Sequence, residues 1–124
     1  MQYRFFAARV FTCRWPEAVA FYRDVIGLPL VFSDERLGWA QYDLGGVFLG
    51  LERCDPDDPV EQELVGRFAG ISLAVDDIQA SYQQLKKRKV RFSAPPEQQL
   101  WGGVLAHFYD LDDNVLTLIG SRSD

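Results

Sequence analysis

Short runs of alternating apolar and polar residues fill most of the chain, and one stretch near its start repeats apolar residues at helical spacing. A helix is expected from Trp15-Pro16 to Gly27, because proline suits the first helical turn and glycine readily ends a helix. Strands are expected on both sides of this helix, over residues 3–12, 28–32, 38–44 and 47–51. The first half therefore predicts the order β-α-β-β-β.

The second half repeats this order after an acidic, proline-bearing segment, residues 53–67. Asp76-Asp77 is expected to cap a helix whose apolar positions are Ile78, Tyr82 and Leu85. Strands are expected at 70–75, 90–93, 104–109 and 115–119, with the loop APPEQQLWGG ahead of the third. The pattern predicts a second β-α-β-β-β unit.

Two matches between the halves indicate a duplication. YDLGGVFLGL (42–51) and YDLDDNVLTLIG (109–120) share a Tyr-Asp-Leu start, a tight turn and a Leu-x-Leu ending. The helix positions of the first half also lie 63 residues before those of the second, as Trp15 does before Ile78. A repeated period is typical of a duplicated unit. We therefore expect Gly50 and Thr117, at the centres of the two Leu-x-Leu segments, to be equivalent.

Composition and charge fit one globular domain of 124 residues, 48% apolar and 25% charged. The net charge of −5 gives no basic field for nucleic acid, and no apolar run reaches the roughly 20 residues of a membrane span. Arg4, Arg9 and Arg14 interrupt any secretory-signal pattern, so we expect a cytoplasmic protein with no nucleic-acid or membrane partner. Cys13 and Cys54 are expected to be reduced thiols, although their number alone also permits one disulfide.

Paired β-α-β-β-β units of this length resemble the vicinal oxygen chelate superfamily, which includes glyoxalases, extradiol dioxygenases and bleomycin-resistance proteins. The resemblance rests on AFYRDVIGL (20–28), VDDI (75–78) and DLDDN (110–114), in which Leu111 and Asp113 replace the usual Pro and Gly. It implies an α+β fold in which two βαβββ modules form curved sheets around a cleft. The expected single domain spans 1–124, with module one at 1–53, a linker at 54–68 and module two at 69–124.

In the metal-using members of this family, each module supplies a His or Gln from its first strand and a Glu from its last, leaving positions open for substrate oxygens. Carried over from the motifs, these places fall on Ala7, Gly50, Gly70 and Thr117. None is a strong ligand, so the resemblance implies no metal site here, and we expect no cofactor. Glu52 becomes a candidate if the alignment slips, but one carboxylate does not hold a metal of this class.

A metal-free cleft with small residues at its floor would bind a small molecule through aromatic side chains. The candidate ligand-binding residues are Phe5, Trp39, Tyr42, Phe48, Glu52, Trp101, His107 and Tyr109. Core packing is the alternative for most of these rings, a surface charge for Glu52, and a structural role for His107. Trp101 stands out because it lies in a loop beside two glycines.

Three functions fit these features. The first is a metal-independent, homodimeric binding protein of the bleomycin-resistance type that holds a planar small molecule, and its negative charge favours a cationic one. The second is an enzyme, either a divergent metal-dependent, glyoxalase-like lyase or dioxygenase, or a metal-free isomerase that uses Glu52 or His107 as a base. The third is an interaction module with a vestigial cleft. Whether the two modules pair within one chain or between two chains stays open at this level.

Overall fold

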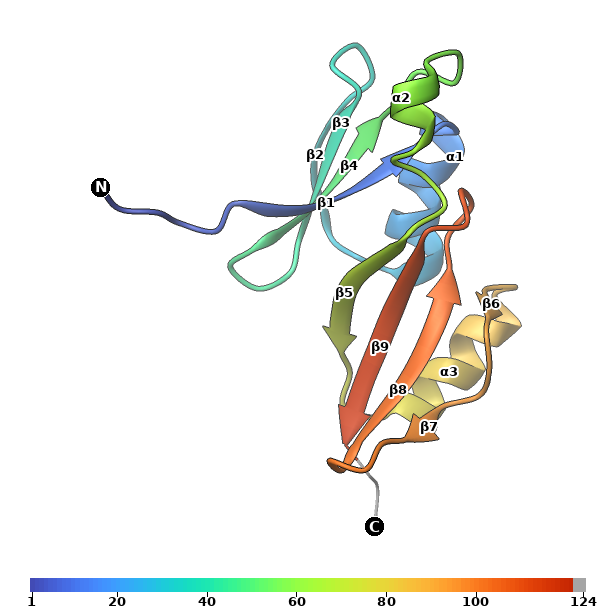
Figure 1. Ribbon diagram of the computed structural model, residues 1–124. Helices are drawn as coiled ribbons and strands as arrows, with labels where there is room; N and C mark the ends of the chain where they lie inside the picture. The colour runs from blue at the N-terminus through green and yellow to red at the C-terminus, as the bar shows by residue number, and fades with distance from the viewer. Residues whose placement is uncertain (122–124) are drawn as a thin grey trace.

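The duplicated βαβββ fold is confirmed in the computed structural model, which describes residues 1–121 (Figure 1). Residues 122–124, the end of the expected module two, lie outside the described residues. The elements of module one are β1 (Ala7–Thr12), α1 (Trp15–Ala20), the π-helical η1 (Phe21–Ile26), β2 (Leu30–Asp34), β3 (Trp39–Asp43) and β4 (Phe48–Arg53). Its sheet has the order β1-β4-β3-β2, with β1 and β4 parallel.

Module two has the same topology with additions. Its elements are α2 (Pro59–Gln62) in the linker, β5 (Phe68–Ala74), α3 (Ile78–Lys87), β6 (Arg91–Phe92), β7 (Glu97–Gln98), β8 (Gly103–Tyr109) and β9 (Val115–Ser121). The sheet order is β5-β9-β8-β6, and β7 also pairs with β8. None of the helices in the described part of the chain is long and apolar enough to cross a membrane.

The first strand is shorter than its sequence pattern suggests. It begins at Ala7, opposite Phe48, so residues 1–6 have no strand beside them and project from the body of the molecule (Figure 1). Tyr3 is 85% exposed and Phe5 67% exposed. The aromatic pattern of this segment was typical of a strand, but no partner strand reaches it.

Two short elements also depart from the expected pattern. Helix α2 lies in the segment expected to be a plain linker, where the Asp58 side chain accepts a hydrogen bond from the amide of Val60 and Pro59 starts the first turn. Strand β7 lies inside the expected loop and pairs antiparallel with the start of β8, so Gln98 lies opposite Val104.

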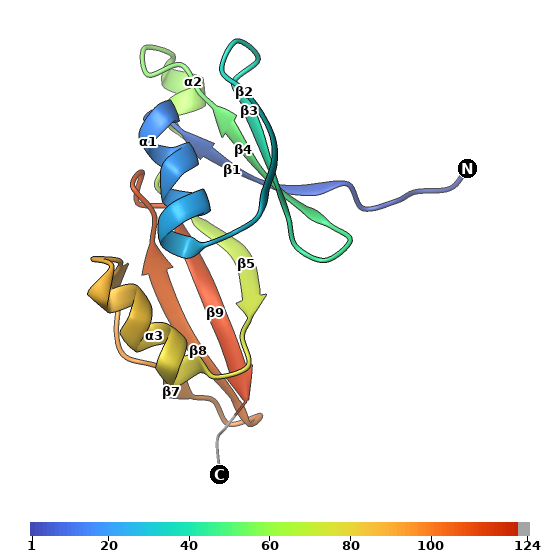
Figure 2. The same cartoon turned by 180° about the vertical axis from the view of Figure 1, so that it is seen from behind.

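Each helix packs its apolar stripe on one face of its own sheet. In module one, Tyr22 packs against Tyr42, with ring centroids 5.9 Å apart, above the fully buried Leu49 and Leu51. In module two the corresponding layer contains Tyr82, which lies edge-on to Phe92 with centroids 4.8 Å apart. Both helices lie on the same side of the molecule, in front of the sheets in Figure 2. The opposite faces of the two sheets therefore lie side by side rather than facing each other across a cleft within one chain.

The two hairpins that share the Tyr-Asp-Leu start are out of step by one residue. Tyr42 pairs with Leu49 across β3 and β4, whereas the residue that pairs with Leu116 across β8 and β9 is Phe108. Phe108, rather than Tyr109, is therefore the structural counterpart of Tyr42. The turn of module two is one residue longer than that of module one.

One candidate ligand-binding residue, Tyr42, lies in the core and not in a cleft. Tyr42 is fully buried on the helix side of β3, and its hydroxyl donates a 2.8 Å hydrogen bond to the carbonyl of Val19. Burial raises the pKa of Tyr42 well above its usual value. Tyr42 is a core residue and cannot line a cleft on the opposite face of the sheet.

A buried polar network joins the two modules on one side of their contact. Asp110, in the turn between β8 and β9, accepts hydrogen bonds from the Tyr22 hydroxyl at 2.5 Å and from Asn114 Nδ2 at 2.9 Å. Asn114 also donates to the carbonyl of Phe11. Burial raises the pKa of the Asp110 carboxyl, and the hydrogen bonds donated by Tyr22 and Asn114 oppose that rise. The turn of module two is thus anchored to the strand and helix of module one.

Candidate functional site

The sheet faces opposite the helices are the surfaces that the family resemblance assigns to ligand, and we call them the outer faces. In module one, a row of three residues crosses the sheet: Arg9 on β1 lies opposite Gly50 on β4, which lies opposite Gln41 on β3. In module two, the matching row is Ser72, Thr117 and His107. The expected equivalence of Gly50 and Thr117 is therefore visible in the strand register.

The indole of Trp39 covers the centre of the module-one outer face. A Cβ atom placed on Gly50 would lie 2.2 Å from Trp39 Cη2, so the ring rests directly on the glycine backbone. Trp39 Nε1 donates a 3.0 Å hydrogen bond to Gln41 Oε1, which fixes the ring in this position. Only glycine fits beneath it.

A charged pair lies beside this ring. Arg9 Nη1 donates to Glu52 Oε1 at 2.9 Å, and the guanidinium also lies 5.4 Å from the centroid of the Phe11 ring. Glu52 pairs with Trp39 across β3 and β4, so the carboxylate and the indole share one part of the outer face. The Glu52 carboxylate is already engaged by a cation of its own chain, which limits its use as a base.

The module-two outer face carries the single histidine. His107 Nδ1 lies 2.8 Å from Thr117 Oγ1, and the exposed Phe68 ring meets the imidazole edge-on with centroids 5.7 Å apart. Tyr109 lies further along β8, beneath the guanidinium of Arg91 at 5.0 Å. This face offers one oriented imidazole with the Phe68 ring beside it.

Of the remaining candidates, Phe48 shares the module-one outer face with Gly50 and Glu52, and Phe5 and Trp101 lie outside the two outer faces. Phe48 is at the start of β4, with its ring 5.9 Å from that of Phe6. Phe5 lies in the projecting amino-terminal segment. Trp101 is 65% exposed in the hairpin between β7 and β8, where its ring packs over Gly103. The structure thus brings Trp39 and Glu52 together, and separately His107 and Tyr109, but it does not gather the set into one cleft within a single chain.

Two outer-face residues were missed in the sequence interpretation, Arg9 and Phe11. Both alternate along β1 with the buried Val10 and Thr12. That alternation is present in the sequence and indicates that Arg9 and Phe11 share one face of the strand.

The residues at the family's metal-ligand places do not fit a metal. Gly50 is covered by Trp39, Thr117 is engaged with His107, and Gly70 lies in a strand irregularity with φ of +70°. Ala7 offers only a methyl group. Within residues 1–121, no three His, Cys, Asp or Glu side chains gather in a group suited to hold an ion.

Comparison with known proteins agrees with this architecture. A family profile for the Glyoxalase/Bleomycin resistance protein/Dioxygenase superfamily matches residues 4–118. The chain belongs to this superfamily. Among curated relatives, the uncharacterized protein YraH of Bacillus subtilis (strain 168) is 24% identical over 111 residues, covering 82% of this chain and 86% of YraH.

Two solved structures match nearly the whole chain. A member of the Glyoxalase/bleomycin resistance protein/dioxygenase superfamily from Sphaerobacter thermophilus DSM 20745 superposes with a TM-score of 0.81 at 25% identity, covering 97% of this chain and 98% of that one. TnmS3, an antibiotic binding protein from Streptomyces sp. CB03234, gives a TM-score of 0.76 at 26% identity, with 98% of each chain covered. The superfamily fold therefore extends over both modules.

Proposed function

We propose that this protein is a metal-independent small-molecule binding protein of the superfamily, in which an aromatic cleft of a homodimer holds the ligand. The observation that carries the proposal is the Trp39 indole resting on Gly50. Where the family's metal-using members have a carboxylate ligand, this chain has a flat aromatic surface. Such a surface binds planar or amphipathic molecules by stacking. The likeness to TnmS3, an antibiotic binding protein, supports the same class of ligand.

The dimer enters the proposal because the outer faces of one chain do not face each other. Both are left uncovered on the side away from the helices, and the residues there include Phe68, which is 64% exposed. A second copy that places its module two over this module one would bring His107 and Tyr109 opposite Trp39 and complete a cleft. The proposed location is cytoplasmic, with no nucleic-acid or membrane partner and no cofactor.

The direct test is calorimetric titration with bleomycin and with the planar antibiotic daunorubicin. We expect one ligand per cleft, and we expect Trp39→Ala to weaken binding at least about tenfold because the stacking surface is lost. Leu37→Ala, at an exposed apolar position between β2 and β3, is the matched control and should leave binding unchanged. Absence of heat for both probes, or equal binding by the Trp39 variant, contradicts the proposed site.

Two further measurements test the other parts of the proposal. Elemental analysis of protein purified without chelator should find no stoichiometric transition metal, and a near-stoichiometric ion would overturn metal independence. Sedimentation equilibrium at micromolar concentration should give a dimer, and a monomer would overturn the shared cleft.

A divergent lyase or isomerase is the second candidate, favoured by the oriented imidazole of His107. Thr117 holds Nδ1, which leaves Nε2 as the nitrogen able to exchange a proton on the outer face. If this candidate holds, His107→Gln abolishes turnover of an α-hydroxy-ketone or hemithioacetal probe while antibiotic binding is retained. Turnover that survives this change excludes His107 as the base.

A further inference from the structure

The two modules meet at the ends of their helices, and the contact joins equivalent positions of the repeat. Arg88 Nη1, at the end of α3, donates a 2.8 Å hydrogen bond to the carbonyl of Val25 in η1, and the two residues are 63 positions apart. This separation is the helix offset of the duplication. The pseudo-twofold axis that relates the two modules therefore passes close to the Arg88–Val25 contact. On each side of this axis the modules meet again, and we call these two equivalent contact regions junctions.

One junction is polar. It is the side on which Asp110 accepts the hydrogen bond from Tyr22. A cavity of about 680 Å³ opens beside this pair. Its lining includes several charged side chains of both signs, among them Arg14, Glu17, Asp24, Arg91 and Asp113.

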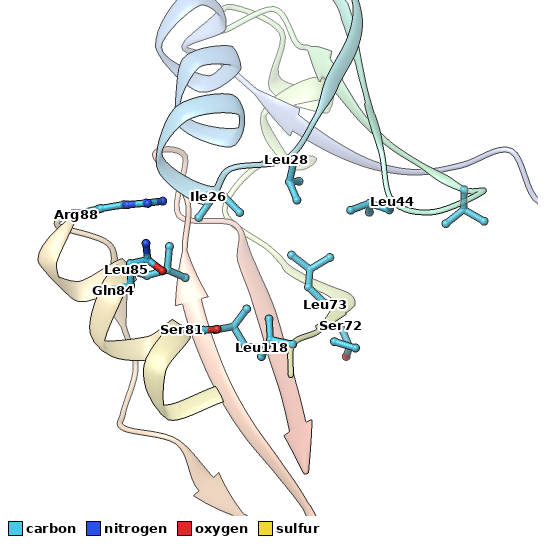
Figure 3. A pocket seen from close by; sticks show the side chains of 13 residues that line it. Ile26, Leu28, Leu44, Ser72, Leu73, Ser81, Gln84, Leu85, Arg88 and Leu118 are labelled. Carbon is cyan, nitrogen blue, oxygen red and sulfur yellow. The ribbon is translucent and has the colours of Figure 1, made fainter. Parts of the chain in front are cut away.

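The equivalent junction has lost these polar groups. The counterpart of Tyr22 is Leu85, and the one-residue step between the hairpins makes Leu44 the counterpart of Asp110. Both leucines line a second cavity, of about 440 Å³, between the end of η1 and β5 and α3 (Figure 3). We call it the apolar junction cavity, and its main apolar residues are Ile26, Leu28, Leu44, Leu73, Leu85 and Leu118.

Its size and composition are those of a ligand site. A volume near 440 Å³ lies within the range of roughly 300–1,000 Å³ usual for small-molecule pockets, which combine apolar walls with a few polar groups. The polar side chains here are Ser81 and Gln84 of α3, whereas Ser72 of β5 borders the cavity with its side chain on the outer face. No hydrogen bond across the junction replaces the Tyr22–Asp110 bond among the described residues of this side.

Arg88 gives the cavity a positive charge. It is the one charged residue in the lining of this cavity, at the rim in Figure 3. Arg88 also borders the polar cavity of the other junction, which contains acidic residues. One of its five N–H donors is used on the carbonyl of Val25, and no carboxylate in residues 1–121 pairs with the guanidinium. A guanidinium beside apolar walls favours a carboxylate on an apolar body.

We propose that the apolar junction cavity binds an amphipathic carboxylate, with its hydrocarbon body among the leucines and its carboxylate on Arg88. This site is separate from the outer faces and does not depend on the function proposed for them. It lies between modules of one chain, so a monomer already contains it.

The test uses decanoate and decanol, which share a chain length and differ in charge. We expect decanoate to bind once per chain, and decanol about tenfold more weakly, because the charge-assisted hydrogen bond to Arg88 is absent. In amide-detected NMR, the residues that shift should be those around 26–28, 44–47 and 81–88.

Three variants locate the site. Arg88→Gln should remove the preference for decanoate over decanol, whereas Arg91→Gln, which removes a charge from the equivalent polar cavity, should not. Val47→Trp fills the cavity from its exposed rim and should weaken both probes at least about tenfold. Because Val47 is 38% exposed, this change is compatible with folding, which a thermal unfolding curve checks.

Several outcomes would overturn the inference. Equal binding of decanoate and decanol would contradict the proposal that Arg88 binds the carboxylate. Binding that Trp39→Ala abolishes and Val47→Trp leaves intact places the probe on the outer face, which contradicts this site while supporting the cleft. Deletion of residues 1–6 that raises decanoate affinity would mean that the amino-terminal segment of a second copy is the natural occupant.

Discussion

The hydroxyl of Tyr22 donates a 2.5 Å hydrogen bond to Asp110, and both residues are buried although they belong to different modules. The bond ties helix η1 to the turn after β8. Burial, followed by the negative charge of Asp110, raises the pKa of Tyr22 well above its usual value. The two groups therefore act as a neutral donor and its acceptor in a buried site, where an unpaired partner is costly.

Tyr22→Phe is expected to lower the free energy of unfolding by about 1.5–3 kcal/mol, because Asp110 loses a donor while staying buried. Urea unfolding at pH 7 measures the change. Tyr82→Phe is the matched control, since Tyr82 is also a buried helix tyrosine but has no hydrogen-bonded hydroxyl among the described residues. Equal stability of wild type and Tyr22→Phe would show that the bond does not hold the modules together.

The buried tyrosines also predict alkaline destabilisation. The pKa values of Tyr22 and Tyr42 are raised by burial, so both stay neutral in the folded chain near pH 10, where they ionise once unfolded. Their contribution to stability is complete below pH 10 and is lost as the pH rises. Each should lower the free energy of unfolding by about 1.4 kcal/mol per pH unit above that point.

Urea unfolding at pH 10, 10.5 and 11 measures this slope. Tyr42→Phe should reduce the slope by the contribution of one tyrosine. The same substitution should also lower stability at neutral pH, because it removes the hydrogen bond to the Val19 carbonyl. A slope equal to that of the wild type would mean that Tyr42 ionises in the folded protein.

A side chain introduced at Gly50 is expected to destabilise the fold and not to create a metal site. Gly50→Ala is expected to lower the free energy of unfolding by about 1–3 kcal/mol or more, because the new Cβ overlaps the Trp39 ring. Gly50→Glu should cost at least as much and bind no metal. In the background Trp39→Ala, the penalty of Gly50→Ala should largely disappear, which a double-mutant cycle by urea unfolding tests. Additive penalties would mean that the ring does not rest on the glycine.

The two cysteines are expected to differ in reactivity. Their Sγ atoms lie 3.1 Å apart, and burial together with the neighbouring Cys13 thiol raises the pKa of Cys54 to about 12. At pH 8 only about one Cys54 thiol in ten thousand would be a thiolate, so iodoacetamide should alkylate Cys13 and spare Cys54 until the chain is unfolded. Peptide mass spectrometry locates the adduct, and Cys13→Ser is the control that should remove it. A mass 2 Da below that of the dithiol would instead reveal a disulfide.

The sequence allowed much of the fold to be predicted because its hydrophobic periods are strong. The helices that begin at Trp15 and Ile78 follow from proline, aspartate caps and apolar stripes, which are local signals. The expected strand over residues 3–12 is wrong for its first four residues, because a strand also depends on a non-local partner. Its aromatic residues are typical of a strand, but a strand exists only where a partner lies beside it, and β4 begins no earlier than Phe48.

The candidate site was predicted only in part. Trp39 and Glu52, both named as candidates, lie together on the outer face, but Tyr42 lies in the core. The shared Tyr-Asp-Leu letters suggested that Tyr42 matched Tyr109. One extra residue in the second turn shifts the register, and a shift of one residue reverses the face of a strand.

The duplication and the secondary-structure order follow from the sequence alone, because residue types and their periods carry that information directly. Tertiary packing sets which ring covers Gly50, which side chains stay buried at the module junctions, and where a cavity remains between Leu44 and Leu85. These depend on contacts between residues far apart in the chain, whose geometry is set by strand register and helix packing rather than by any local pattern.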